Sequence, residues 1–305
     1  MADASAGTET GMDPATDTGA QAGPPQVFDS RRSELGEGLL WHPGRGQLFW
    51  FDIPEGRLLS RDETGPLAWA LLETCSAAGW VDDDTLILGG ERRLWRFDLG
   101  RGTATALAVL DEDPALRSND GRADPWGGFW ISTTDKEGAR DRGAIWRWHR
   151  GEVRRLVEGL TTPNAICFAR DHALYADTPR QRVWRLPLDG EGWPAGPARP
   201  WLDLSDRGLN PDGAVIDADG LFWCALWGGG RVAAFDEAGA VVRTVAFDAP
   251  NVTCPAFGGP GLTTLYVTTA LEGMDDDARA AAPRAGMVQA VAGAGRGRAE
   301  PAVTL

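Results

Sequence analysis

The chain has 305 residues and carries 30 basic against 44 acidic side chains, so its formal net charge is −14 at pH 7. A charge of this sign and size disfavours binding to nucleic acid, because a polyanion attracts basic proteins. No run approaches the roughly 18 apolar residues of a membrane-spanning helix, so we expect no membrane partner.

The chain divides into a short N-terminal segment and one long domain. Residues 1–26 are mainly Ala, Gly, Thr, Asp and Pro, which predicts disorder because too little apolar surface can be buried. They lack the basic and apolar regions of a secretory signal, so we expect a cytoplasmic protein. Residues 27–305 are predicted to form a single domain. The cysteines show no close pairing and lie in or beside apolar runs, which predicts buried free thiols at Cys75, Cys167, Cys224 and Cys254.

The long domain repeats a pattern of one apolar run, a turn and a second apolar run. The pattern is clearest at 210–232, where Asp-Ala-Asp-Gly at 217–220 separates two such runs. Asp-Gly in this context is a strong hairpin signal. The second runs begin near residues 48, 86, 129, 174, 222 and 265, so the period is 38 to 48 residues. This period predicts an all-β fold, a six-bladed β-propeller.

Most of these hairpins are followed by a further strand, predicted at 93–99, 144–149, 182–188 and 231–236. Residues 27–32 begin the domain and have no partner in the first blade. We expect them to pair beside residues 286–291 as the outer strand of the sixth blade, because closure of this kind protects sheet edges.

One register position of the repeat always carries a side-chain oxygen. It lies four residues before the end of each first run, at Glu37, Ser76, Asn119, Asn164, Asp212 and Thr253. Equivalent positions on the innermost strands of a propeller form a ring, and carboxylate and amide oxygens suit a hard divalent cation. These residue types are also ordinary turn formers, which is the preferred explanation for Ser76 and Thr253. Glu37, Asn164 and Asp212 are predicted to bind a metal.

Arg117 and Asn119 flank this ring from the third repeat. A guanidinium offers a fork of donors and an amide both donates and accepts, which suits sugar hydroxyls or a lactone carbonyl. The alternative is a surface arginine and a turn asparagine. Glu137, in the loop after Thr134, is a further candidate substrate contact, and a solvated surface position explains it equally well.

Five groups of residues carry a family resemblance when taken together. They are Leu35-Gly36-Glu37-Gly38; Arg117-Ser118-Asn119-Asp120-Gly121; Pro163-Asn164-Ala165; Asn210-Pro211-Asp212-Gly213 with Gly228-Gly229-Gly230-Arg231-Val232; and Phe257-Gly258-Gly259 with Leu265-Tyr266-Val267-Thr268. Over roughly residues 30–291 the chain resembles the SMP-30/gluconolactonase (regucalcin-like, LRE) family.

The resemblance implies a six-bladed propeller that hydrolyses sugar-acid lactones with one divalent metal. It implies Glu37, Asn164 and Asp212 as metal ligands, with Asp212 also the general base. It further implies substrate contacts at Arg117, Asn119 and Glu137. Two backbone-shaping positions depart from the family pattern: Leu39 stands where Pro is usual, and Ala165 where Gly is common.

These observations favour a metal-dependent, gluconolactonase-like hydrolase. The metal would act as a Lewis acid on the lactone carbonyl, and Asp212 would take a proton from the attacking water. Two alternatives are a non-catalytic regulatory propeller that binds a divalent metal and a protein-interaction propeller. Ca²⁺, Zn²⁺, Mg²⁺, Mn²⁺ and Fe²⁺ all accept such a mixed oxygen set. A monomer or a weak homo-oligomer is expected, with a small sugar lactone as partner.

Overall fold

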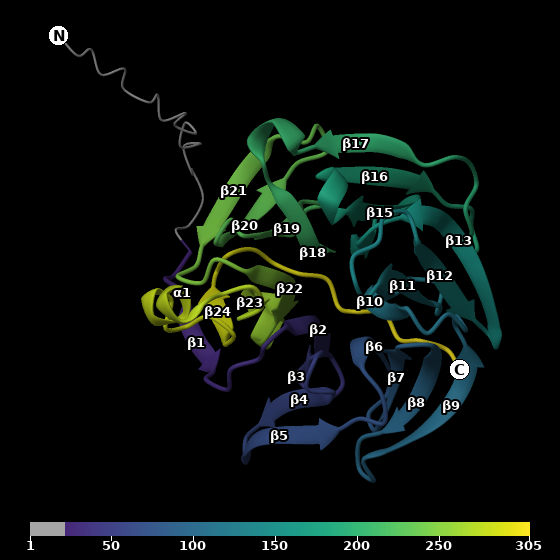
Figure 1. Cartoon of the computed structure of the whole chain (residues 1–305), viewed down its shortest axis with the longest axis horizontal. Coiled ribbons are helices and arrows are strands. Elements are labelled where there is room, and N and C mark those ends of the chain that lie inside the picture. The colour runs from purple at the N-terminus through teal and green to yellow at the C-terminus, as the bar shows by residue number, and fades with distance from the viewer. Residues whose placement is uncertain (1–21) are drawn as a thin grey trace.

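The computed structural model describes residues 22–305, and nearly all of their regular structure is β-strand (Figure 1). The predicted disordered segment, residues 1–26, lies outside the described residues except for 22–26. Within that short stretch the amide of Gly23 donates a hydrogen bond to the carbonyl of Ala292, over 3.0 Å. The first strand, β1, then begins at Gln26.

Six four-stranded sheets surround a central axis (Figure 1). Blade one contains β2 (Gly36–His42), β3 (Gln47–Asp52), β4 (Arg57–Asp62) and β5 (Gly65–Ala70). Blade two contains β6 (Cys75–Asp82), β7 (Thr85–Gly90), β8 (Arg93–Asp98) and β9 (Thr103–Val109). Blade three contains β10 (Leu116–Ala123), β11 (Phe129–Asp135), β12 (Gly143–His149) and β13 (Glu152–Leu160).

The second half of the ring repeats this order. Blade four contains β14 (Pro163–Phe168), β15 (His172–Asp177), β16 (Arg182–Pro187) and β17 (Arg199–Asp203). Blade five contains β18 (Asn210–Ile216), β19 (Phe222–Trp227), β20 (Arg231–Phe235) and β21 (Val241–Ala246). Blade six contains β22 (Val252–Gly258), β23 (Thr264–Thr269), β24 (Val288–Ala292) and β1 (Gln26–Asp29). The predicted six-bladed β-propeller is confirmed.

The chain's first described strand closes the ring. β1 pairs antiparallel with β24, and Gln26 lies opposite Ala290. The buried carboxylate of Asp29 accepts hydrogen bonds from Arg31 Nε at 2.9 Å and from Arg61 Nε at 3.1 Å. Arg61 belongs to β4, so these contacts tie blade six to blade one. The expected pairing of residues 27–32 beside 286–291 is therefore confirmed at β1 and β24.

The core consists of apolar clusters that fill the blades and the spaces between them. Trp50, Trp130 and Trp223 have no exposed surface. The indole N–H groups of Trp130 and Trp223 donate to turn carboxylates, at 3.0 Å to Asp124 and 2.8 Å to Asp217. These two buried indoles therefore keep a hydrogen-bond partner, whereas the buried indole N–H of Trp50 has none among the described residues. All four cysteines are free and buried, as predicted.

Two segments depart from the blade pattern. α1 (Asp276–Ala281) follows β23 and begins after Asp275, whose side chain accepts a hydrogen bond from the amide of Ala278. Among residues 22–305, no helix has the length and the apolar character that crossing a membrane requires. The C-terminal segment after β24 runs across the ring (Figure 1). There the amides of Val303 and Thr304 donate to the carbonyls of Trp80 and Gly127, at 2.8 and 2.9 Å.

Candidate metal and substrate site

Every inner strand bears a register shift at the ring position predicted from the repeat. The shifts lie at Glu37/Leu40, Cys75/Ala77, Ser118/Gly121, Asn164/Cys167, Pro211/Ala214 and Val252/Pro255. A bulge bends the strand and re-aims a side chain. The same irregularity therefore recurs in all six blades, beside each of the six oxygen-bearing side chains.

Four of those six side chains line one cavity of about 160 Å³. Glu37, Asn119, Asn164 and Asp212 enter it from blades one, three, four and five, and Arg117 joins them from β10. The structure thus brings together all three predicted metal ligands and two of the three predicted substrate contacts. Asp212 is 5% exposed, and Glu37 is half-buried.

Ser76 and Thr253 do not line this cavity but join neighbouring blades. The hydroxyl of Ser76 donates to the carbonyl of Asn119, and that of Thr253 donates to the carbonyl of Gly36, each over 2.5 Å. Both hydroxyls are buried. These contacts are structural, which agrees with the preferred sequence interpretation of the two residues.

The side chain of Asn164 is held on both sides. Its Oδ1 accepts from Asn119 Nδ2 at 3.0 Å, and its Nδ2 donates to Thr178 Oγ1 at 2.8 Å. Thr178 in turn donates to the carbonyl of Pro211 at 2.7 Å. The amide of Asn164 is therefore oriented by blade three on its oxygen side and linked to blade five on its nitrogen side.

Arg117 presents part of its guanidinium to the cavity. Its Nη1 donates to the carbonyl of Ser118 at 2.8 Å and to Oδ1 of Asn119 at 3.0 Å. Within the described residues, Nε and Nη2 have no hydrogen-bond partner, so they are available to a ligand. Burial lowers the pKa of Arg117, and the charge of Glu272, which also lines the cavity, opposes that shift.

The carboxyl groups at the site disfavour one another's ionisation. Burial, followed by the charge of Asp120, raises the pKa of Glu37 to about 8. Burial and then the charge of Glu37 raise the pKa of Asp212 well above its ordinary value. Burial also raises the pKa of Asp120 to about 6. A cation among these groups would remove both the repulsion and the desolvation cost.

The donor set fits a hard divalent cation. It consists of two carboxylates and one oriented amide oxygen, the ligand types that Ca²⁺, Mg²⁺ and Mn²⁺ prefer. Among residues 22–305, no cluster of three or more His, Cys, Asp or Glu side chains is arranged to hold a metal. The candidate site is instead mixed, because Asn164 supplies its third oxygen.

The residue after a predicted ligand has a left-handed backbone in two blades. Gly38 has φ +59° and Ala165 has φ 57°. A Cβ at Gly38 would lie 2.2 Å from the carbonyl oxygen of Ser76, so only glycine fits there. Ala165 adopts the same conformation with a Cβ, at the steric cost of a left-handed non-glycine residue. The departure at position 165 therefore leaves the backbone geometry in place.

Glu137 lies apart from the other predicted site residues. It is exposed in the turn after β11 and is not among the residues that line the cavity. Its amide donates to Oδ1 of Asp135 over 2.9 Å. A role for Glu137 in substrate binding stays a prediction.

The sequence interpretation missed several cavity residues. Thr162, Thr178, Trp227 and Glu272 also line the cavity. Thr178 follows β15 directly, and Trp227 ends β19. Because the second strand of a hairpin returns to the edge where the first began, the ends of the second strands were a signal for these two positions.

Comparison with known proteins gives a consistent assignment. Residues 35–271 match the family described as "SMP-30/Gluconolactonase/LRE-like region". A "Putative sugar lactone lactonase" of Rhizobium meliloti (strain 1021) is 38% identical, over 92% of this chain and 97% of that protein. The L-arabinolactonase of Azospirillum brasilense is 33% identical, over 88% of this chain and 91% of that protein. These names denote carboxylic-ester hydrolases.

A solved structure agrees with this assignment. The crystal structure of the calcium-binding protein regucalcin from Agrobacterium tumefaciens str. C58 superposes with a TM-score of 0.89 and 34% identity. The match covers 92% of this chain and 97% of that one. The chain therefore belongs to the SMP-30/gluconolactonase/LRE-like family, as its motifs predicted.

Proposed function

We propose that this chain is a carboxylic-ester hydrolase that opens sugar-acid lactones, with a divalent cation held by Glu37, Asn164 and Asp212. One observation carries the proposal. Two carboxylates with raised pKa values and one oriented amide oxygen, from three separate blades, meet in one small cavity. The lactonase names of relatives that match nearly the whole chain support the reaction class.

The three proposed ligands contribute different groups to the cation site. Glu37 and Asp212 supply negative charge, while Asn164 supplies a neutral oxygen whose direction Asn119 and Thr178 fix. When bound, such a cation supplies a Lewis acid for the lactone carbonyl oxygen. The donor set itself does not distinguish Ca²⁺, Zn²⁺, Mg²⁺, Mn²⁺ and Fe²⁺.

Asp212 is the proposed general base. As a water oxygen bonds to the carbonyl carbon, the Asp212 carboxylate takes the water proton. The ring C–O bond then breaks, and the departing ring oxygen takes that proton to become a hydroxyl. Lactone and water thus give one hydroxy acid, and Asp212 returns to its carboxylate form.

The remaining cavity residues are proposed to hold the sugar. Arg117 offers Nε and Nη2 as donors, and Asn119 offers Oδ1 as an acceptor, because both hydrogens of its Nδ2 already face Pro163 and Asn164. Glu272 is exposed and lines the cavity, where it could accept from a hydroxyl. Contact with Glu137 would need a part of the substrate that extends outside the cavity.

The test is lactone opening with and without metal. Hydrolysis of D-glucono-, L-arabino- and D-xylono-lactone is followed with a pH indicator, after EDTA treatment and again after each of the five cations is added. We expect at least one lactone to be opened, EDTA to abolish this activity and one or more cations to restore it. Hydrolysis that EDTA leaves unchanged would contradict the proposed metal dependence. Cation binding without hydrolysis of any lactone would favour a non-catalytic regulatory propeller.

A further inference from the structure

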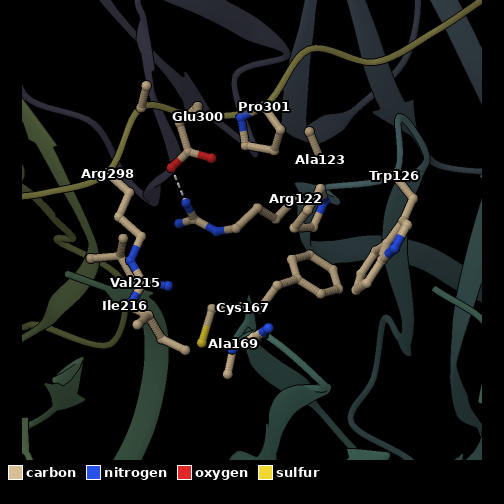
Figure 2. Close-up of a pocket in the computed structure, with 14 residues that line it drawn as sticks. Arg122, Ala123, Trp126, Cys167, Ala169, Val215, Ile216, Arg298, Glu300 and Pro301 are labelled. Atoms are coloured by element: carbon tan, nitrogen blue, oxygen red, sulfur yellow. Dashed lines mark hydrogen bonds and ion pairs between the residues drawn. The ribbon is translucent and has the colours of Figure 1, made fainter. Parts of the chain in front are cut away.

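A second cavity lies on the face opposite the candidate catalytic site. Its volume is about 440 Å³, and its walls come from the ends of β10, β14 and β18 and from the C-terminal segment (Figure 2). The same three strands carry Asn119, Asn164 and Asp212 near the other mouth of the ring. Four residues further along each strand stand Ala123, Phe168 and Ile216, which line this second cavity. At about 3.3 Å per residue, some 13 Å of strand separates the two sites.

The walls of this cavity are mainly apolar. Trp126 and Phe168 meet edge to face, with ring centroids 6.5 Å apart, and Val215 and Ile216 lie across from Trp126 (Figure 2). A concave site of several hundred cubic ångströms with apolar and aromatic walls and a few polar groups is typical of small-molecule binding. The C-terminal segment contributes Pro301 to the same lining.

The residues that line the cavity carry more positive than negative charge. Three arginines and one glutamate line it, and Arg122 and Glu300 form an ion pair with each other. Within residues 22–305, neither Arg170 nor Arg298 makes an ion pair or a side-chain hydrogen bond, and both are exposed. Two positive charges therefore border an apolar pocket in a chain whose net charge is −14.

Arg298 is placed to reach a ligand inside the cavity. Figure 2 shows it on the same side as Val215 and Ile216. Its Nη2 would lie 4.0 Å from a Cβ added at Gly220, in the turn between β18 and β19. Burial raises the pKa of the Cys167 thiol in the cavity wall, and the charge of Arg298 opposes that shift. The guanidinium therefore lies near the turn between β18 and β19, and Arg298 lines the cavity beside Val215 and Ile216.

We propose that this cavity is a second small-molecule site, and that it binds a compact organic anion with a flat apolar body. The apolar part would lie between Trp126, Phe168 and Ile216, and its carboxylate or sulfonate would pair with Arg298 and Arg170. A planar guanidinium pairs well with such groups and also stacks on flat rings. The site is independent of the proposed lactonase chemistry, because it shares no side chain with that cavity.

The test uses two fluorescent probes of matched shape. 8-Anilinonaphthalene-1-sulfonate is the anion, and N-phenyl-1-naphthylamine is its analogue without the sulfonate. Binding to the folded full chain is measured at neutral pH for the wild type and for Arg298→Gln, Arg170→Gln and Ala169→Trp. Arg207→Gln is the control, since Arg207 is also exposed but lies on the segment that leads to β18 and the other face. Circular dichroism and thermal melting establish that each variant folds.

We expect the anion to bind at one site per chain. Arg298→Gln should weaken it about tenfold, the loss of one charge-assisted contact, and Arg170→Gln should weaken it in the same direction. The neutral analogue should be unaffected by either change. Ala169→Trp should abolish both probes by filling the cavity, and Arg207→Gln should change neither. Non-saturable binding, or anion binding that survives both arginine variants and Ala169→Trp, would overturn the proposal. The second site does not depend on lactone hydrolysis, so a chain without lactonase activity would not contradict this proposal.

Discussion

Asn119 donates a hydrogen bond from Nδ2 to Oδ1 of Asn164 over 3.0 Å, and so links blade three to blade four at the proposed metal site. Partners that orient a ligand in this way usually contribute strongly to metal affinity. Asn119 therefore has two proposed roles, because the same side chain also offers Oδ1 to the sugar.

Removing this contact should loosen the third ligand. We expect Asn119→Ala to weaken metal affinity about 10- to 100-fold, the usual effect of losing an orienting partner. Thr178→Val should act in the same direction, because Thr178 holds the other end of the Asn164 amide. Calorimetric titration with Mn²⁺ measures the affinity. If both variants bind as tightly as the wild type, Asn164 either needs no orientation or is not a ligand.

The raised pKa of Glu37 predicts how the metal-free protein responds to pH. Glu37 has an ordinary pKa of 4.5 and a folded-state pKa of about 8. Between these values the folded state binds a proton that the unfolded state has released. Stability from this group is therefore complete below about pH 4.5 and is lost as pH rises toward 8. A bound cation would take over the role of the proton.

Substitution of Glu37 isolates this effect. Glu37→Gln removes the titrating group, so in EDTA its melting temperature should improve relative to the wild type as pH rises from 5 to 8. Glu55→Gln is the matched control, since Glu55 is an exposed residue of the same blade. If the melting temperatures of the wild type and of Glu37→Gln change in parallel between pH 5 and 8, the raised pKa of Glu37 is contradicted.

A buried ion pair is predicted to hold the C-terminal segment on the ring. Arg122 pairs with Glu300, and the side chains are only 11% and 10% exposed. The same guanidinium donates to the carbonyls of Ile166 and Ala214, at 3.2 and 3.0 Å. One side chain of β10 therefore contacts β14, β18 and the C-terminal segment.

Breaking this pair from one side should be costly. Glu300→Ala leaves a buried guanidinium without its counter-charge, and we expect a loss of about 3–5 kcal/mol in the free energy of unfolding. The double variant Arg122→Met with Glu300→Leu should recover most of that loss, because apolar replacement of a whole buried pair is often neutral. Urea denaturation measures both. A double variant as unstable as the sum of its two single variants would contradict a coupled pair.

The sequence predicts the inner part of each blade better than the outer part. Hairpins such as β18–β19 combine a continuous apolar run with an Asp-Gly turn, and both signals are local. The outermost strands lack these signals. β13, for example, has the sequence EVRRLVEGL, and most of its residues are exposed or half-buried. An edge strand that covers one side of a blade needs few apolar residues, so its composition resembles that of a loop.

The register of the repeat predicts only those site residues that occupy a repeated position. Glu37, Asn164 and Asp212 occupy equivalent positions of one repeat, so the repeat predicts that they meet. Glu272 lies in a loop after β23, outside any repeated position. Glu300 meets Arg122 across 178 residues of sequence, and no local pattern indicates that the segment after β24 returns across the ring. Such contacts depend on the assembled propeller.

The most direct test of the account separates the two proposed roles of Asp212. Lactone hydrolysis is measured across a metal titration for Asp212→Asn and Glu37→Gln, with Asp219→Asn and Glu55→Gln as exposed controls from the same blades. Asparagine keeps the oxygen and the shape of aspartate but loses the charge and the basicity. We expect Asp212→Asn to bind metal at raised concentration and yet to show a kcat lower by about 10²–10⁴ at saturation, the weight of a general base. Glu37→Gln should regain much more of its rate, and full recovery of Asp212→Asn at high metal would contradict its role as the base.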